Sequence, residues 1–214
     1  MRFIFLTHAS RTLVFAASAA ISIPAQAGND ITMKNGAIIG TLASWGIAAL
    51  RQSPIKVCMT DGIWGARAQA GHDKELDFAS LATVRRDCLL AEASGWQLNV
   101  ASVASISRWR ASSGTTGAWD IAFVPMLRWK RPLEMNLRVD VEFGIGPAWL
   151  SETNIGNRRK STNFQFSDHL GLGLGDADGR WRAGLAYRHI SNAGIRTPNN
   201  AVDFKGISLE WQLE

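Results

Sequence analysis

The stretch MNLRVDVEFGI, residues 135–145, alternates strictly between two kinds of side chain. From its first residue every second side chain is apolar, and the side chains between them include Arg138, Asp140 and Glu142. Successive side chains of a β-strand point to opposite faces. The stretch therefore predicts a strand with one wholly apolar face and one face that carries charges of both signs.

Units of about ten alternating residues, each closed by a turn or loop, recur from about residue 61 to the end of the chain. Aromatic residues at strand ends are typical of the two interfaces of a membrane, and several units begin or end with Trp. The units start near Gly62, Leu76, Trp96, Trp119, Met135, Phe164, Trp181 and Asp203. The tryptophans at their ends are Trp96, Trp109, Trp119, Trp129, Trp149, Trp181 and Trp211. This pattern predicts an all-β fold, an eight-stranded antiparallel transmembrane β-barrel, and a soluble β-sandwich is the alternative.

The connections between the units favour the barrel. With a periplasmic N-terminus, the short connections at 130–134 and 176–180 lie on the periplasmic side, whereas the longer loops at 151–162 and 193–202 face outward. Short inner turns and longer outer loops are typical of outer-membrane barrels. Since eight strands leave an interior that side chains fill, we expect interior salt bridges rather than a diffusion pore.

The first 60 residues divide into two parts. Arg2 and Arg11, the apolar run 12–23 and the sequence Ala-Gln-Ala at 25–27 predict a signal peptide over residues 1–27. The run is shorter than the roughly 20 residues of a spanning helix. Residues 28–60 form an N-terminal extension that fits a short helix, a plug or a disordered leader equally well, and residues 61–214 form the barrel.

The two cysteines, Cys58 and Cys88, lie almost opposite each other across the first predicted hairpin, so a structural disulfide is expected in an exported chain. Two cysteines without nearby histidine do not complete a metal site, and we predict no metal. The net charge of +5 fits a solvated surface or attraction to an anionic membrane face. Nucleic acid is not an expected partner, because no basic helix is present.

The stretch RHISNAGIRTPNNAVDF, residues 188–204, carries the candidate chemistry. In a hairpin centred near residue 196, His189 and Asp203 are cross-strand partners, and Ser191 lies two residues along on the same lipid-facing side. This arrangement fits a Ser-His-acid triad, in which Asn192 and the backbone N–H groups near Gly194 stabilise an oxyanion. The alternative is a solvated strand cap in the headgroup zone.

The HISNAGI block at 189–195 with its following Pro-Asn, and FQFSDHLG at 164–171, resemble the PagL family of outer-membrane lipid A 3-O-deacylases, over about residues 60–214. The resemblance implies an eight-stranded barrel with a metal-free site on its outer wall. It implies His189 as base, Ser191 as nucleophile, Asp203 as acid and Asn192 in the oxyanion hole, and Gly194 and Asn199 match family positions. The family's usual acid is Glu, which is one methylene longer than Asp203, and the chain ends in Leu-Glu rather than in an aromatic residue.

These observations predict a cofactor-free serine esterase of the Gram-negative outer membrane that acts on lipid A of lipopolysaccharide. Outer-membrane lipids are further expected partners. A phospholipase and a non-catalytic structural or adhesive barrel are the alternatives, and a homodimer is left open. Arg158, Arg159, Lys160 and Arg196 are either lipid A phosphate ligands or solvated loop charges. His169 shares the inner face of its strand, where we expect a buried structural histidine rather than a second catalytic one.

Overall fold

The computed structural model describes residues 31–50, 62–114 and 116–213, which form one helix and ten strands. None of the helical residues described forms a helix long and apolar enough to cross a membrane. The elements are α2 (Ile31–Leu50), β1 (Ile63–Asp73), β2 (Leu76–Ala93), β3 (Trp96–Ala111), β4 (Gly117–Pro132), β5 (Leu137–Leu150), β6 (Asn154–Ile155), β7 (Arg158–Arg159), β8 (Phe164–Asp176), β9 (Trp181–Ser191) and β10 (Val202–Gln212).

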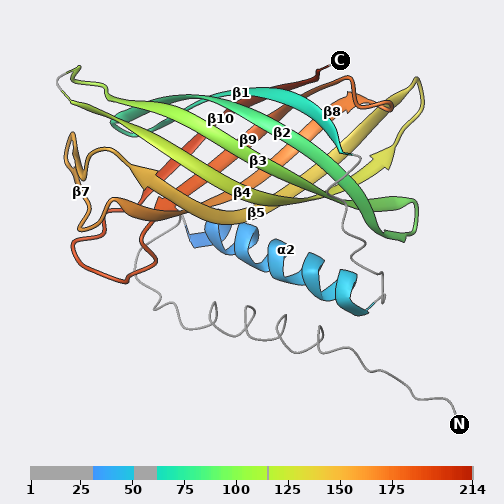
Figure 1. The fold of residues 1–214 in the computed structure, drawn as a ribbon, viewed down its shortest axis with the longest axis horizontal. Coiled ribbons are helices and arrows are strands. Elements are labelled where there is room, and N and C mark those ends of the chain that lie inside the picture. The colour runs from blue at the N-terminus through green and yellow to red at the C-terminus, as the bar shows by residue number, and fades with distance from the viewer. Residues whose placement is uncertain (1–30, 51–61, 115, 214) are drawn as a thin grey trace, which may run out of the picture.

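The eight long strands form a closed barrel in which every neighbouring pair is antiparallel, as Figure 1 shows. Strands β1 and β10 close the barrel, with Gly65 opposite Gln212 and His72 opposite Lys205. The predicted fold class is therefore confirmed, and the closed sheet excludes the two-layered sandwich. The short strands β6 and β7 form a separate hairpin within the loop between β5 and β8, which the alternation did not predict.

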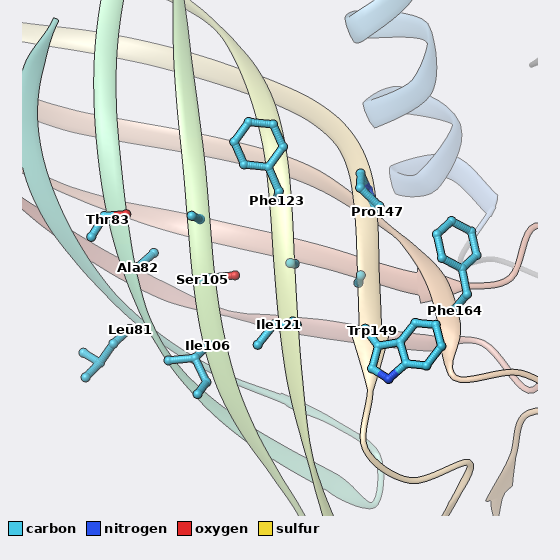
Figure 2. Close-up of a pocket in the computed structure, with 13 residues that line it drawn as sticks. Leu81, Ala82, Thr83, Ser105, Ile106, Ile121, Phe123, Pro147, Trp149 and Phe164 are labelled. Carbon is cyan, nitrogen blue, oxygen red and sulfur yellow. The ribbon is translucent and has the colours of Figure 1, made fainter.

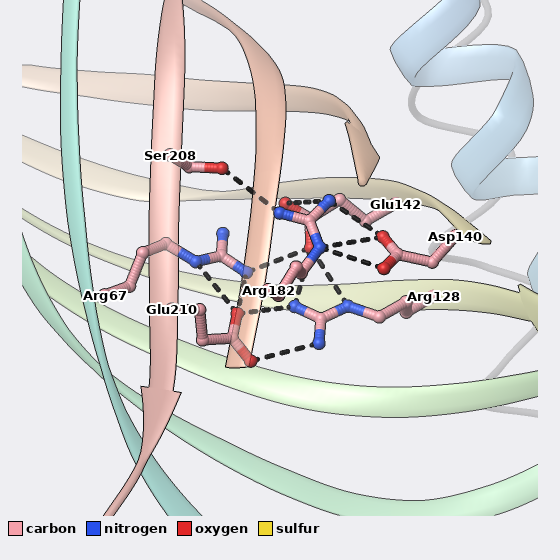
Figure 3. Close-up of polar contacts among 7 residues, drawn as sticks. All are labelled: Arg67, Arg128, Asp140, Glu142, Arg182, Ser208 and Glu210. Atoms are coloured by element: carbon pink, nitrogen blue, oxygen red, sulfur yellow. Dashed lines mark hydrogen bonds and ion pairs between the residues drawn. The ribbon is translucent and has the colours of Figure 1, made fainter. Parts of the chain in front are cut away.

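Part of the barrel interior is polar and is held by buried ion pairs (Figure 3), and buried apolar clusters occupy other parts of it. Arg128 binds the carboxylates of Glu142 and Glu210, each at 2.8 Å, and Arg67 binds the same two groups at 2.9 and 2.7 Å. Beside them Arg182 binds Asp140 at 2.8 Å. The charged face of residues 135–145 thus points inward, and its two carboxylates, Asp140 and Glu142, are paired as expected.

The outer face of the barrel wall is apolar. Its exposed large side chains include Leu81, Ile121, Leu172, Leu185 and Ile207, which come from five different strands. A polar interior and an apolar exterior are the arrangement of a barrel that meets lipid, the reverse of a soluble protein.

Tryptophans at strand ends are expected to face the membrane interfaces. Trp119 and Trp149 agree with this expectation, and for Trp109 it is wrong. Trp119 and Trp149 are half exposed on the outer wall, whereas Trp109 is fully buried inside the barrel. Its indole N–H donates to Asp120 at 2.5 Å, and its ring meets Phe204 edge-on at 4.9 Å. The residue stands near a strand end, but its register in β3 places it on the inner face.

Helix α2 lies along the outside of the barrel and contacts β5 and β8 (Figure 1). A Cβ atom on Gly40 would stand 2.3 Å from the ring of Phe143, so the helix approaches the wall where it has no side chain. The indole N–H of Trp129 donates to Ser44 Oγ at 2.8 Å. Of the three expectations for residues 28–60, a helix is what the structure has over 31–50.

Several predictions concern residues outside the described part of the chain. These are the signal peptide over 1–27 and one half of the disulfide, Cys58, together with the side chain of Cys88 in β2. They stay predictions.

We predict that the interior ion pairs contribute strongly to stability. Glu142→Gln leaves Arg67 and Arg128 buried with one carboxylate fewer, and breaking a buried pair in this way costs about 3–5 kcal/mol. The measurement is the urea midpoint of the purified barrel in detergent micelles. The control is Asp178→Asn, which removes an exposed pair with Arg180 that spans 3.5 Å and should leave the midpoint close to that of the native protein. Equal midpoints for the two variants would contradict the prediction.

Candidate active site

At the outer end of β9 and β10 the structure brings together His189, Ser191 and Asp203. The pairing of the two strands places Asp203 directly opposite His189. His189 Nδ1 lies 2.7 Å from Asp203 Oδ1, and His189 Nε2 lies 3.0 Å from Ser191 Oγ. The imidazole therefore contacts the hydroxyl with one nitrogen and the carboxylate with the other.

The hydrogen-bond partners determine what each imidazole nitrogen does. An ionised carboxylate only accepts hydrogen bonds, so Nδ1 of His189 carries the hydrogen that points to Asp203. In the neutral ring Nε2 is then an acceptor, directed at the hydroxyl of Ser191. The side chains of His189 and Asp203 are 4% and 16% exposed, so little water competes for these contacts. This arrangement can withdraw the proton from a nucleophilic serine.

Tyr187 is a member of the site that the sequence reasoning missed. Its hydroxyl donates to Oδ1 of Asp203 at 2.5 Å, the same oxygen that accepts from His189. Tyr187 is the one tyrosine of the chain and is buried. Its position two residues before His189, on the same face, was the available signal.

The loop after Ser191 is held by the side chain of Asn192, which is fully buried. Its amide nitrogen donates to Ser161 Oγ at 3.1 Å and to the carbonyl of Arg196 at 2.7 Å, while its Oδ1 accepts from the N–H of Gly194 at 3.0 Å. The N–H of Asn192 itself donates to Asn199 Oδ1 at 3.1 Å. Both amide hydrogens of Asn192 are thus engaged within the loop.

A backbone N–H that points at Ser191 belongs to Ala193. It donates to Ser191 Oγ at 3.4 Å, from a residue with a positive φ of 53°. Gly194 follows with a φ of 79°, which glycine adopts without strain. Two successive residues in the left-handed region turn the main chain sharply, and this turn directs the N–H of Ala193 toward Ser191.

The four loop cations that are candidate phosphate ligands or solvated charges lie in different environments. Arg158 binds the carboxylate of Asp73 at 3.1 Å and the carbonyl of Ala201 at 3.2 Å, so it joins loops within the protein. Lys160 is buried, with 4% of its surface exposed. Arg159 and Arg196 are exposed at the outer end of the barrel.

His169 lies inside the barrel, as expected, and forms a second serine–histidine contact. Its Nε2 is 3.0 Å from Ser167 Oγ, and Arg188 Nε donates to the same hydroxyl at 2.8 Å. Within the described part of the chain, no three His, Cys, Asp or Glu residues gather closely enough to hold a metal ion.

A family model, "Lipid A 3-O-deacylase (PagL)", matches residues 81–212, which is more than half of the chain and includes His189, Ser191 and Asp203. The chain belongs to the PagL family. The predicted resemblance is therefore confirmed.

Similar proteins agree with this assignment. Lipid A deacylase PagL of Bordetella bronchiseptica is 36% identical over 106 residues, which cover 49% of this chain and 57% of the relative. Lipid A deacylase PagL of Pseudomonas aeruginosa is 27% identical over 115 residues, which cover 51% and 65%. The matched region thus spans less than two thirds of either relative. The crystal structure of the outer membrane enzyme PagL shares the fold, with a TM-score of 0.64 and 22% identity over 70% of this chain and 99% of that one.

An apolar groove of about 750 Å³ lies on the outer wall of this PagL-family barrel (Figure 2). Its lining includes Ala104, Phe123, Pro147, Trp149 and Phe164. It occupies the part of the wall that β2 to β5 form, together with the start of β8.

Strand register connects this groove to Ser191. Ser191 pairs with Phe166 on β8, and Phe166 pairs with Pro147 on β5, which lines the groove. Phe123 of the groove pairs in turn with Ala104 on β3. Ser191 ends β9 and Phe166 lies just inside β8, whereas Ala104 is near the middle of β3. This series of paired residues therefore leads from the end of the barrel at Ser191 toward the middle of the outer wall.

We predict that Tyr187→Phe lowers the kcat of hydrolysis of a chromogenic short-chain ester about tenfold and leaves KM unchanged. A hydrogen bond to a charged group contributes about 1.5–3 kcal/mol, and a loss of about 1.4 kcal/mol in the transition state is tenfold in rate. Leu185→Phe, an exposed position on the same face of β9, is the matched control. A native kcat for Tyr187→Phe would contradict the prediction, because it would show that hydrolysis does not depend on the hydrogen bond from Tyr187 to Asp203.

Proposed function

We propose that the chain is a serine esterase of the Gram-negative outer membrane that removes the ester-linked 3-O acyl chain from lipid A of lipopolysaccharide. The observation that carries the proposal is the hydrogen-bonded array of Ser191, His189 and Asp203 on the outward wall of a PagL-family barrel. Relatives of this chain are named lipid A deacylases, and the solved relative is named an outer membrane enzyme. Lipopolysaccharide is the proposed partner, and a homodimer stays a prediction.

The reaction follows the geometry of the site. His189 Nε2 takes the proton of Ser191 Oγ as the oxygen attacks the ester carbonyl carbon. The bond from that carbon to the sugar oxygen then breaks, and the imidazolium gives its proton to this leaving oxygen, which becomes the free sugar hydroxyl. Asp203 holds the Nδ1 hydrogen and stabilises the imidazolium. In a second round His189 takes a proton from water, whose oxygen attacks the carbonyl carbon of the acyl-serine. The bond from that carbon to Ser191 Oγ breaks, the fatty acid leaves, and His189 returns the proton to Ser191 Oγ.

The oxyanion of the tetrahedral intermediate lies beside Ser191 Oγ. We assign its stabilisation to the N–H of Ala193, because preorganised backbone donors lower the energy of developing negative charge. Asn192, Gly194 and Asn199 support that donor by holding the loop, since their contacts are with one another and with Ser161 and Arg196.

Two other parts of the molecule fit the rest of the substrate. The exposed guanidinium groups of Arg159 and Arg196 are available for lipid A phosphates, which guanidinium binds with paired hydrogen bonds.

The apolar groove suits an acyl chain. Because neighbouring strands are about 4.8 Å apart, Pro147 on β5 lies about 10 Å from the strand of Ser191, within reach of a fatty acyl chain.

We predict that lipid A from cells that produce this protein lacks one ester-linked acyl chain, and that Ser191→Ala restores the intact mass. The measurement is mass spectrometry of extracted lipid A, with an empty vector for comparison. Ser167→Ala is the matched control, because Ser167 also contacts a histidine but faces the interior. Loss of an acyl chain from phospholipid rather than from lipid A would favour the phospholipase alternative. Unchanged lipids, with the barrel folded in the outer membrane, would favour a structural barrel.

We predict that Ala104→Trp lowers the rate on lipid A about tenfold. The indole keeps a few methylene groups of the acyl chain out of the groove, and each loses about 0.8 kcal/mol of burial free energy. Hydrolysis of a short-chain ester should keep its native rate, because that ester does not extend into the groove. Ala183→Trp places the same side chain on the outward face of β9, away from the groove, and serves as control. Equal rates on lipid A for both variants would remove the groove from the substrate path.

A further inference from the structure

Lys160 is a buried cation whose position the reaction above does not explain. It lies between β7 and β8, and its ammonium donates to three oxygens: Gln165 Oε1 at 3.2 Å, the carbonyl of Ile190 at 3.1 Å and the carbonyl of Asn200 at 3.0 Å. An ammonium has three N–H donors, and here each has an acceptor. Lys160 therefore connects the β7–β8 segment to the end of β9 and to the loop that precedes β10.

These contacts act on both sides of the nucleophile. Ile190 directly precedes Ser191, and its carbonyl accepts from Lys160 Nζ. The main chain of Lys160 forms an antiparallel bridge with Asn199, whose side-chain oxygen accepts the N–H of Asn192, the residue after Ser191. One residue thus holds the chain before and after Ser191, by its side chain on one side and through Asn199 on the other.

The charge of this cation responds to pH near neutrality. Burial lowers the pKa of Lys160 to about 7, and the positive charge of Arg158 acts in the same direction, whereas Asp203 and Asp73 raise it. The neutral amine has two N–H groups and cannot donate to all three acceptors. Loss of the proton therefore removes one of the contacts that join the loops around Ser191.

We propose that Lys160 is a positioning residue of the esterase site, which fixes the main chain on both sides of Ser191, rather than a ligand of lipid A phosphate. The inference rests on the proposed function. In this proposal the β5–β8 loop, although far from the HISNAGI block in sequence, helps to set the distance between Ser191 and His189. It also helps to direct the N–H of Ala193.

The first test is active-site titration of the purified barrel with a fluorophosphonate, which reacts with an activated serine. Lys160→Met is expected to react at every site but at least about tenfold more slowly per site, a change of about 1.4 kcal/mol in the transition state. A merely structural role would reduce the number of reactive sites and leave the rate per site native. Lys74→Met, at an exposed lysine in the turn between β1 and β2, is the control with a native rate.

The second test uses Lys160→Arg, which keeps the charge at all accessible pH values and should recover part of the rate. Between pH 7 and 9 the labelling rate of the native protein should fall relative to that of Lys160→Arg, because only the native protein loses its cation there. A constant ratio across this range, or a native rate per site for Lys160→Met, overturns the inference. If the native protein reacts with neither fluorophosphonate nor ester, the proposed function itself fails.

Discussion

The structure depends on one constraint: a backbone in contact with hydrocarbon must satisfy its own hydrogen bonds. A closed sheet does so without leaving an edge, and this chain closes its sheet by pairing β1 with β10. Closure gives each long strand a hydrogen-bonded neighbour on both sides, and β9 and β10 are one such pair. The hairpin register of that pair sets Asp203 opposite His189, so the candidate site lies on two strands that the closed sheet holds in place.

The same constraint reverses the usual distribution of polar groups. Charged side chains occupy the barrel interior, where Arg67, Arg128, Glu142 and Glu210 bind one another without exposed charge. Polar groups on the outer wall must find partners of their own, because lipid supplies none. Around Ser191 they do so in a continuous set of contacts. Tyr187 and His189 both bind Asp203, His189 also contacts Ser191, and side chains of the neighbouring loops hydrogen-bond to one another beside them.

Alternation of side chains was sufficient to predict the barrel and the pairing of His189 with Asp203, because both depend on a period of two and a hairpin centre. It did not predict that Trp109 faces inward, since a position near a strand end says nothing of the face. Tyr187 was missed because an aromatic residue on a lipid-facing strand is ordinary there. The sequence predicts Lys160 to be a lipid A phosphate ligand or a solvated loop charge, and it does not predict the burial of this side chain, because the three acceptors come from segments up to 40 residues away. Contacts between loops are tertiary, and no local pattern encodes them.

Ser167 and Ser191 each contact a histidine, and catalysis is proposed for Ser191 alone. Ser191 has its histidine backed by a carboxylate on the outer wall, whereas Ser167 lies inside the barrel beside Arg188. The most direct test is to label the folded protein with a fluorophosphonate and locate the adduct by peptide mass spectrometry. The account predicts one adduct, on Ser191, that disappears in His189→Ala. An adduct on Ser167, or no adduct on a correctly folded barrel, would contradict it.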